Sequence, residues 1–394
     1  MDKATLKAEG ASVKAGANQG GTVDGTVNWK MRLHLPRPRL HRPILTLHLS
    51  IAVTAGLFMV VLGITGSIMA FEPELDRLLH AHLSYIKPSG NVLTLGEIGE
   101  AVSRQFPGEP VVAYLPSESP DVSSEVILSR GIVCVNQYTG EILGLRSRGQ
   151  TFFGLARELH VRLAFGNVGR RIVRWSGVAM LVSLASGLYL WWPSKQVRIR
   201  GNWRGAGFWF GLHSAVGIFS LIPFLVLATT GTVIGFEDQA ATVIGALIGS
   251  AQDGGARNVP RQQPTLGAAM ITPDQAVAIA LAEMPGTMPY RVQMPAYGGA
   301  YRVSLDDTRD RIAGEHNMIA IDQYNGKVIF SSHSNDLSPA ERILATNESI
   351  HTGQVLGMPS KILACLASFI LPVQVISGLL LWLRRRRRPH PAAD

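Results

Sequence analysis

Long apolar segments without charged side chains alternate with polar stretches along this chain of 394 residues. Four segments contain no Lys, Arg, Asp or Glu: residues 44–71, 175–192, 205–236 and 362–383. A helix needs roughly 20 apolar residues to cross the hydrocarbon core of a membrane, and each segment is near or above that length. The pattern therefore predicts an integral membrane protein with four transmembrane helices in a bundle.

The two long polar stretches, residues 72–159 and 237–350, have the patterns of small α+β domains. Each begins with a helix-like alternation, in which Thr94 and Thr272 take the N-cap position. Strand-like runs follow, in residues 125–137, 301–307 and 317–323. Tyr-Thr-Gly and Tyr-Asn-Gly tripeptides after these runs are typical of tight hairpin turns. We therefore predict two separate small α+β domains outside the membrane.

The chain repeats itself when it is aligned with its own sequence. A shift of 165 residues places the first apolar segment on the third and aligns His48 with His213. A shift of 191 residues places the second apolar segment on the fourth and aligns His160 with His351. The same shifts align pairs of small residues: Thr65-Gly66 with Thr230-Gly231, and Ser186-Gly187 with Ser377-Gly378. A unit of helix, domain and helix therefore occurs twice.

Basic residues are concentrated on one predicted side of the membrane. Three segments carry 14 Lys and Arg against one acid: residues 30–43, 194–207 and 384–394. Because Lys and Arg accumulate in cytoplasmic loops, we expect both termini in the cytoplasm and the two domains in the periplasm. The net charge of +9 is thus explained by basic residues that mark the cytoplasmic side of the membrane. We therefore expect a lipid bilayer around the chain but no nucleic-acid partner.

These patterns give a complete predicted plan. It assigns a disordered basic tail to residues 1–43, membrane helices to 44–71 and 208–236, periplasmic domains to 72–159 and 237–350, entry segments with membrane helices to 160–193 and 351–383, and basic cytoplasmic segments to 194–207 and 384–394.

The motifs of the two repeats resemble those of the PepSY-associated transmembrane helix family. In both repeats the order is His, Thr-Gly, Phe-Glu, then Asp/Asn-x-Tyr-x-Gly, then Leu/Ile-His, Gly and Ser-Gly-Leu-x-Leu-Trp, and the resemblance covers residues 44–388. Members include bacterial iron-regulated inner-membrane proteins and ferric-siderophore reductases. The resemblance implies periplasmic PepSY domains, bound haem and a redox role in iron acquisition.

Hydropathy places the four aligned histidines without reference to any family. His48 and His213 lie near the cytoplasmic ends of their helices, and His160 and His351 lie near the opposite ends. A titratable side chain at membrane depth is costly and usually marks a site. Two pairs, one at each face, are what axial ligation of two haem b groups requires. The alternative is that the histidines are interfacial residues kept by duplication, and the aligned glycines also fit plain helix packing.

Three functions remain open from the sequence. The first is a di-haem electron-transfer protein, a membrane oxidoreductase that reduces a ferric siderophore or another ferric chelate in the periplasm. The second is a non-catalytic PepSY scaffold that regulates a periplasmic protease or envelope sensor, and the third is quinol-linked electron transfer to another partner. The chain has no nucleotide-binding motif, so the electron donor would be a quinol or a cytoplasmic reductase.

Overall fold

The computed structural model describes residues 40–117, 119–147, 152–249, 269–295, 299–307 and 317–386. The chain divides into two units, Met1–Arg39 and Leu40–Asp394, and all of the described helices and strands belong to the second unit. The predicted N-terminal tail lies almost wholly outside the described residues, and so does the end of the chain after Arg386.

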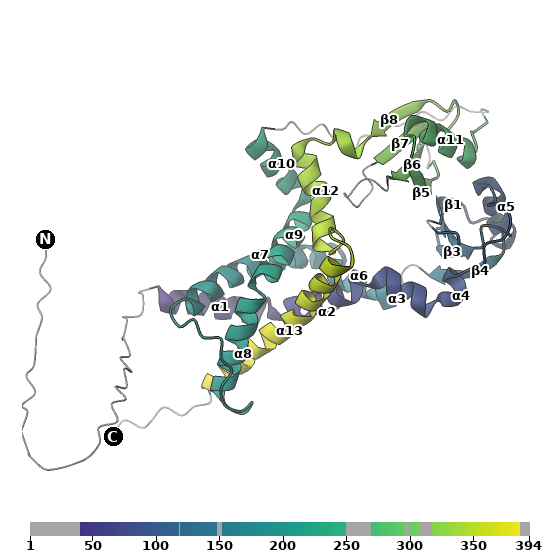
Figure 1. The fold of residues 1–394 in the computed structure, drawn as a ribbon. Helices are drawn as coiled ribbons and strands as arrows, with labels where there is room; N and C mark the ends of the chain where they lie inside the picture. Colours follow the sequence, from purple (N-terminus) through teal and green to yellow (C-terminus); the bar gives the residue numbers. More distant parts are fainter. Residues whose placement is uncertain are drawn as a thin grey trace, which may run out of the picture. The chain divides into compact units, whose positions relative to one another are not determined.

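The described helices account for the apolar segments and for the connections between them and the strands (Figure 1). They are α1 (His41–Thr54), α2 (Gly56–Met69), α3 (Glu72–Leu79), α4 (Ala81–Ser84), α5 (Leu95–Gln105), α6 (Phe152–Arg162), α7 (Gly166–Trp191), α8 (Ala206–Phe219), α9 (Leu221–Gly235), α10 (Glu237–Ile248), α11 (Pro273–Glu283), α12 (Pro339–His351) and α13 (Met358–Arg386).

The predicted bundle of four transmembrane helices is wrong. Two continuous helices, α7 and α13, are long and apolar enough to cross a membrane. The first and third apolar segments are each divided into two helices, which meet at 59° between α1 and α2 and at 63° between α8 and α9. The described residues therefore offer two spans, or up to four if each bent pair is one span.

Local chemistry explains both bends. At the end of α1, the Thr54 hydroxyl donates to the Ser50 carbonyl at 2.8 Å, and after Ala55 the next helix begins at Gly56. A side chain that bonds back to its own helix, followed by glycine, favours a kink. In the third segment, Pro223 is the third residue of α9. Proline is tolerated in the first turn of a helix but not in its interior, so a new helix begins just before it. An unbroken apolar run hides both features.

The prediction of two separate α+β domains is also wrong, because the strands of both stretches form one antiparallel sheet. Its order is β4-β3-β2-β1-β5-β6-β7-β8. The strands are β1 (Val111–Leu115), β2 (Ser124–Leu128), β3 (Gly131–Val135), β4 (Ile142–Ser147), β5 (Met288–Gln293), β6 (Ala300–Asp306), β7 (Asn317–Asp322) and β8 (Val328–Ser332). The two four-stranded parts join through β1 and β5, where Ala113 pairs with Gln293 and Tyr114 pairs with Val292.

Elements within each part follow the sequence more closely. Thr94 and Thr272 cap α5 and α11, each in a capping box with the residue three positions later. The glycines of the two predicted turns, Gly140 and Gly326, have φ of 72° and 69°, which is the left-handed conformation that glycine adopts without strain. The helix starts and the hairpin turns predicted from local pattern are therefore confirmed.

A shared core and a helix cap stabilise the union of the two parts. The core under the sheet contains buried residues of both, including Val126 and Val133 from one and Val303 and Ile319 from the other. Asp274, on α11, also accepts hydrogen bonds from the first two backbone N–H groups of α5, at 2.7 and 2.9 Å. These N–H groups have no partner within their own helix, and a carboxylate there is stabilised by the helix dipole.

Candidate histidine sites for a bound cofactor

The four aligned histidines form two pairs, and each pair takes one residue from each sequence repeat. His48 on α1 faces His213 on α8, with ring centroids 6.2 Å apart. His160 on α6 faces His351 on α12, with ring centroids 6.4 Å apart. The structure thus brings together all four residues that the sequence singled out, in the predicted combinations.

A buried hydroxyl holds one nitrogen of each ring in the His160/His351 pair. Thr65 Oγ1 lies 2.9 Å from His160 Nδ1, and Thr230 Oγ1 lies 2.9 Å from His351 Nδ1. Both threonines belong to the same repeat as the histidine they contact, and both are at most 7 % exposed. The two contacts therefore have the same geometry in both repeats.

The direction of these hydrogen bonds follows from the hydroxyl proton. Thr65 donates its proton to the Val61 carbonyl at 2.7 Å, and Thr230 donates to the Val226 carbonyl at 2.7 Å. A hydroxyl has one proton, so each threonine oxygen must accept from the N–H at Nδ1. The rings are then the Nδ1–H tautomer, and Nε2 keeps a free lone pair for a metal.

The His48/His213 pair is held by serines and carbonyls on α7 and α13. His48 Nδ1 lies 2.9 Å from Ser186 Oγ, and His213 Nδ1 lies 3.0 Å from the Gln374 carbonyl and 3.3 Å from Ser377 Oγ. Ser186 and Ser377 each donate to a carbonyl of their own helix at 3.0 Å. The same argument therefore assigns the Nδ1–H tautomer to His48 and His213.

Glycine makes room for every one of these rings. A methyl group added at Gly66, Gly187, Gly231 or Gly378 would lie 2.9 to 3.2 Å from the Cε1 atom of its histidine. Such contacts are closer than ordinary van der Waals separation, so a larger residue at any of these positions would displace the ring that packs there. The aligned glycines, whose function the sequence left open, are the surfaces against which the imidazoles pack.

A cavity of about 1340 Å³ opens beside the His160/His351 pair. Residues of the helices, including Met59 and Phe224, line one part, and residues near the strands, including Ser123, line another. Ligand pockets usually have volumes of about 300–1,000 Å³. The space next to these two histidines is therefore larger than one ordinary ligand needs.

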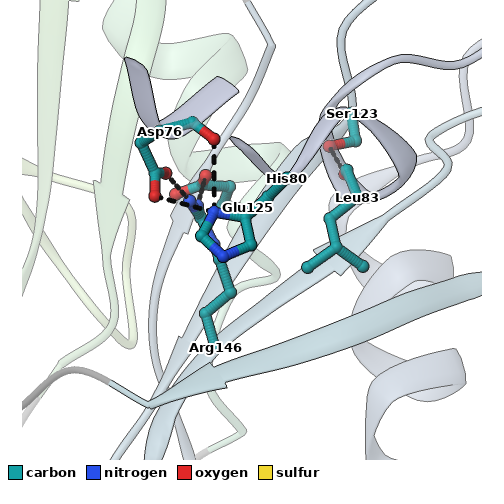
Figure 2. Close-up of polar contacts among 6 residues, drawn as sticks. All are labelled: Asp76, His80, Leu83, Ser123, Glu125 and Arg146. Atoms are coloured by element: carbon teal, nitrogen blue, oxygen red, sulfur yellow. Dashed lines mark hydrogen bonds and ion pairs between the residues drawn. The ribbon is translucent and has the colours of Figure 1, made fainter. Parts of the chain in front are cut away.

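Charged residues on the cavity wall are paired with one another (Figure 2). Arg146, at the end of β4, contacts both Asp76 on α3 and Glu125 on β2, and its side chain is 14 % exposed. His80 Nδ1 lies 3.0 Å from the Asp76 carboxylate. This cluster links the helix that follows the first bent pair to the sheet. Pattern analysis missed it, because its members have no counterpart in the other repeat.

Glu72 and Glu237 are acidic residues that the shift of 165 residues aligns with each other. Glu72 forms an ion pair with Arg157, at 2.8 Å. Both Glu72 and Glu237 line the cavity, and the ion pair shows that Glu72 has a structural partner there.

The spacing of the rings in each histidine pair fits two imidazole ligands of one metal, as in a haem. With a metal–nitrogen bond of about 2 Å and a ring nitrogen about 1 Å from the centroid, two imidazoles on opposite sides of one metal have centroids about 6 Å apart. The observed 6.2 and 6.4 Å agree with that value. Among the described residues no three His, Cys, Asp or Glu side chains gather around a common point. A structural zinc ion takes four protein ligands, whereas haem iron needs only axial ones.

Comparison with known families places the whole helical region and the sheet in one family. The family model for the PepSY-associated TM region matches residues 45–385. This chain belongs to that family. It is therefore a membrane protein of the PepSY-associated class, in agreement with its apolar helices. No curated protein matches the chain at a significant level.

Proposed function

We propose that this PepSY-associated protein is a di-haem b-type electron-transfer protein of the bacterial inner membrane that reduces a ferric chelate, such as a ferric siderophore, in the periplasm. The electrons would come from a quinol or a cytoplasmic reductase. The observation that carries the proposal is the geometry of the two histidine pairs, in which an oxygen accepts from every Nδ1–H and Nε2 is the unprotonated nitrogen of each ring. The Gln374 amide nitrogen lies 3.4 Å from His213 Nε2 and would have to move for a metal to bind there.

Haem iron, when bound, supplies a one-electron carrier at each pair. The protein's own part is to hold and separate the two positions. The hydroxyls of Thr65 and Thr230 fix the ring orientations at one pair, and Ser186 and Ser377 do so at the other. Between the pairs along the helices lies a cluster of buried apolar side chains, among them Met59, Met180 and Phe224, which also forms part of the cavity wall.

The orientation in the membrane is proposed from the two continuous helices alone. After α7 the chain carries Lys195, Arg198 and Arg200, and α13 ends in Arg384 to Arg386. Both helices therefore end in basic segments, which favours a cytoplasmic location for those ends. His160 and His351 precede the opposite ends of α7 and α13, so their pair and its cavity would face the periplasm.

The cavity beside His160 and His351 supports a substrate next to that pair. Its volume leaves space beyond one cofactor, and paired charges such as Arg146 with Glu125 offer polar contacts to an oxygen-rich chelate. Transfer of one electron to the bound Fe³⁺ gives Fe²⁺. Hard oxygen ligands hold the less charged ion more weakly, so the metal would be released for transport.

An absorbance spectrum of the detergent-purified protein tests the proposal. We expect low-spin haem bands that sharpen with dithionite and return to the oxidised form when a ferric chelate is added without air. His160→Ala and His351→Ala should each remove about half of the haem absorbance, and His48→Ala and His213→Ala the other half. A colourless protein, or full haem content in all four variants, would contradict the proposal and favour the scaffold function.

A further inference from the structure

The helix α7 fixes the two levels of the membrane surface. Its uncharged stretch, residues 175–192, begins with Trp175 and ends with Trp192, and both side chains are largely exposed, at 62 % and 61 %. At 1.5 Å per residue the stretch is about 26 Å long, close to the hydrocarbon thickness of about 30 Å. Because tryptophan gathers at the two membrane–water interfaces, Trp175 marks the interface on the side of the His160/His351 pair.

The helix α10 begins at the level of Trp175. The Trp175 ring packs edge-on against Phe236, with ring centroids 5.4 Å apart. Phe236 has a non-helical backbone, with φ of −114° and ψ of 38°, so the chain changes direction between α9 and α10. Residues 239–249 contain no charged side chain. Val243 and Leu247, which lie about one turn apart on the same side of α10, are 56 % and 79 % exposed.

The helix α3 has the same place in the other repeat. The shift of 165 residues aligns Phe236 with Phe71, whose backbone is also non-helical, with φ of −116° and ψ of 22°. On α3, Glu74 forms an ion pair with Lys361, the residue directly before the uncharged stretch 362–383 of α13. This contact places the beginning of α3 at the membrane surface, as the contact with Trp175 does for α10.

Three exposed leucines form one face of α3. Leu75, Leu78 and Leu79 follow the spacing of a single helical face and are 40 %, 71 % and 63 % exposed. On another face of the same helix, Asp76 contacts Arg146 of the sheet (Figure 2). Single exposed apolar side chains are ordinary on protein surfaces, but a contiguous group beside a membrane span marks a surface that another molecule covers.

We propose that α3 and α10 are interfacial helices, which lie in the membrane surface beside the His160/His351 pair with their exposed apolar faces among the lipid chains. Leu78 and Val243, which the shift of 165 residues aligns, then occupy equivalent positions in the two repeats. An amphipathic helix of this kind is buried about 5–10 Å into the boundary between headgroups and acyl chains. The inference goes beyond the proposed function and requires no haem.

Nitroxide labels on single cysteines test the inference in liposomes that contain the full-length protein. Leu78→Cys and Val243→Cys carry labels on the two apolar faces. Val92→Cys is the matched control, because Val92 is 62 % exposed but lies in the segment that leads into α5 and the sheet. Phe369→Cys gives the reference for lipid, because Phe369 is 64 % exposed within α13.

The depth of each label follows from its collisions with oxygen, which concentrates in lipid, and with a nickel chelate, which stays in water, measured by electron paramagnetic resonance. All variants carry Cys365→Ala, and the buried Cys134 stays in place. We expect the labels at positions 78 and 243 to have an oxygen-to-nickel collision ratio several-fold above that of the Val92→Cys label. Their depth should be about 5–10 Å, less than that of the Phe369→Cys label.

Each other outcome would overturn the inference. A collision ratio equal to that of Val92→Cys would place the two faces in water, where a soluble partner could bind them. Poor access to both reagents, with dipolar broadening between labels, would show that a second copy of the chain covers them. Leu79→Cys and Leu247→Cys repeat the measurement on the same faces if a first variant does not fold. The absorbance of the same samples reports haem separately, so a failure of the proposed function is recognised independently.

Discussion

Replacing Thr65 by valine removes a buried hydroxyl and nearly nothing else. The residue is 4 % exposed, and valine has almost the same shape. The Val61 carbonyl, to which the hydroxyl donates, keeps its place in the helix ladder. The group left without a partner is the N–H at Nδ1 of His160, which the hydroxyl oxygen accepts at 2.9 Å.

Either response of His160 to this loss weakens a metal bond at Nε2. If the proton stays on Nδ1, an unpaired buried donor costs about 1–3 kcal/mol. If the proton moves to Nε2, that nitrogen can no longer bind a metal. A free energy of about 1.4 kcal/mol is a factor of ten in affinity. We therefore expect Thr65→Val to weaken haem binding by about 10- to 100-fold.

The assay is the transfer of haem from the purified protein to an excess of apomyoglobin, followed by absorbance. Thr65→Ser keeps the hydroxyl and serves as the matched control, and we expect it to retain haem nearly as well as the wild type. Thr230→Val should repeat the effect of Thr65→Val, because Thr230 makes the same contacts with His351. Equal transfer rates for Thr65→Val and the wild type would refute the assignment of the hydroxyl as the acceptor.

Three further changes test the sheet by thermal unfolding followed by circular dichroism. Arg146→Met should destabilise the sheet by about 1–3 kcal/mol, because the half-buried carboxylates of Asp76 and Glu125 lose their cation. Adding Asp76→Asn to this variant should recover part of the lost stability. If the destabilisations of the two single variants simply added, the cluster would be contradicted. Asp274→Asn should cost about 1–2 kcal/mol through the cap of α5, and an unchanged melting temperature would contradict that cap. Burial raises the pKa of the Cys134 thiol from 9.0 to about 11. Between these two values the folded chain keeps a proton that the unfolded chain releases. The contribution of Cys134 to the free energy of unfolding is therefore complete below pH 9 and is lost as pH rises towards 11. Cys134→Ala should reduce the fall of the unfolding free energy over this pH range, and an unchanged fall would contradict the raised pKa.

The candidate sites could be predicted because their evidence is local and repeated. A histidine in or just ahead of an apolar segment is unusual, and two sequence shifts align four of them in two pairs. The hydrogen bonds that fix the rings could be predicted only in part. Thr65 and Ser186 stand out in the sequence as small residues beside glycines, but the contact of each with a particular nitrogen requires the crossing of two helices. Gln374 does not stand out, since it has no like residue in the other repeat.

The membrane helices were over-predicted for a related reason. Hydropathy measures whether a segment can lie in lipid, and it is blind to a bend within the segment. The bend before Pro223 can be predicted from the sequence, because proline favours the first turn of a new helix. The bend at Ala55 depends on one serine carbonyl and one threonine hydroxyl, and such pairs are common in straight helices too.

The pairing of the strands of the two repeats in one sheet has the same symmetry as the pairing of the histidines. When two similar units meet about a two-fold axis, the elements that lie on the axis contact their own counterparts. His48 meets His213 and His160 meets His351 in this way. The strands β1 and β5 are also counterparts, each being the first strand after the capped helix of its repeat, and they pair antiparallel, as a two-fold axis requires. The same rule allows the first strands of the two repeats to pair, and the pairing of β1 with β5 joins the two halves into one sheet of eight strands.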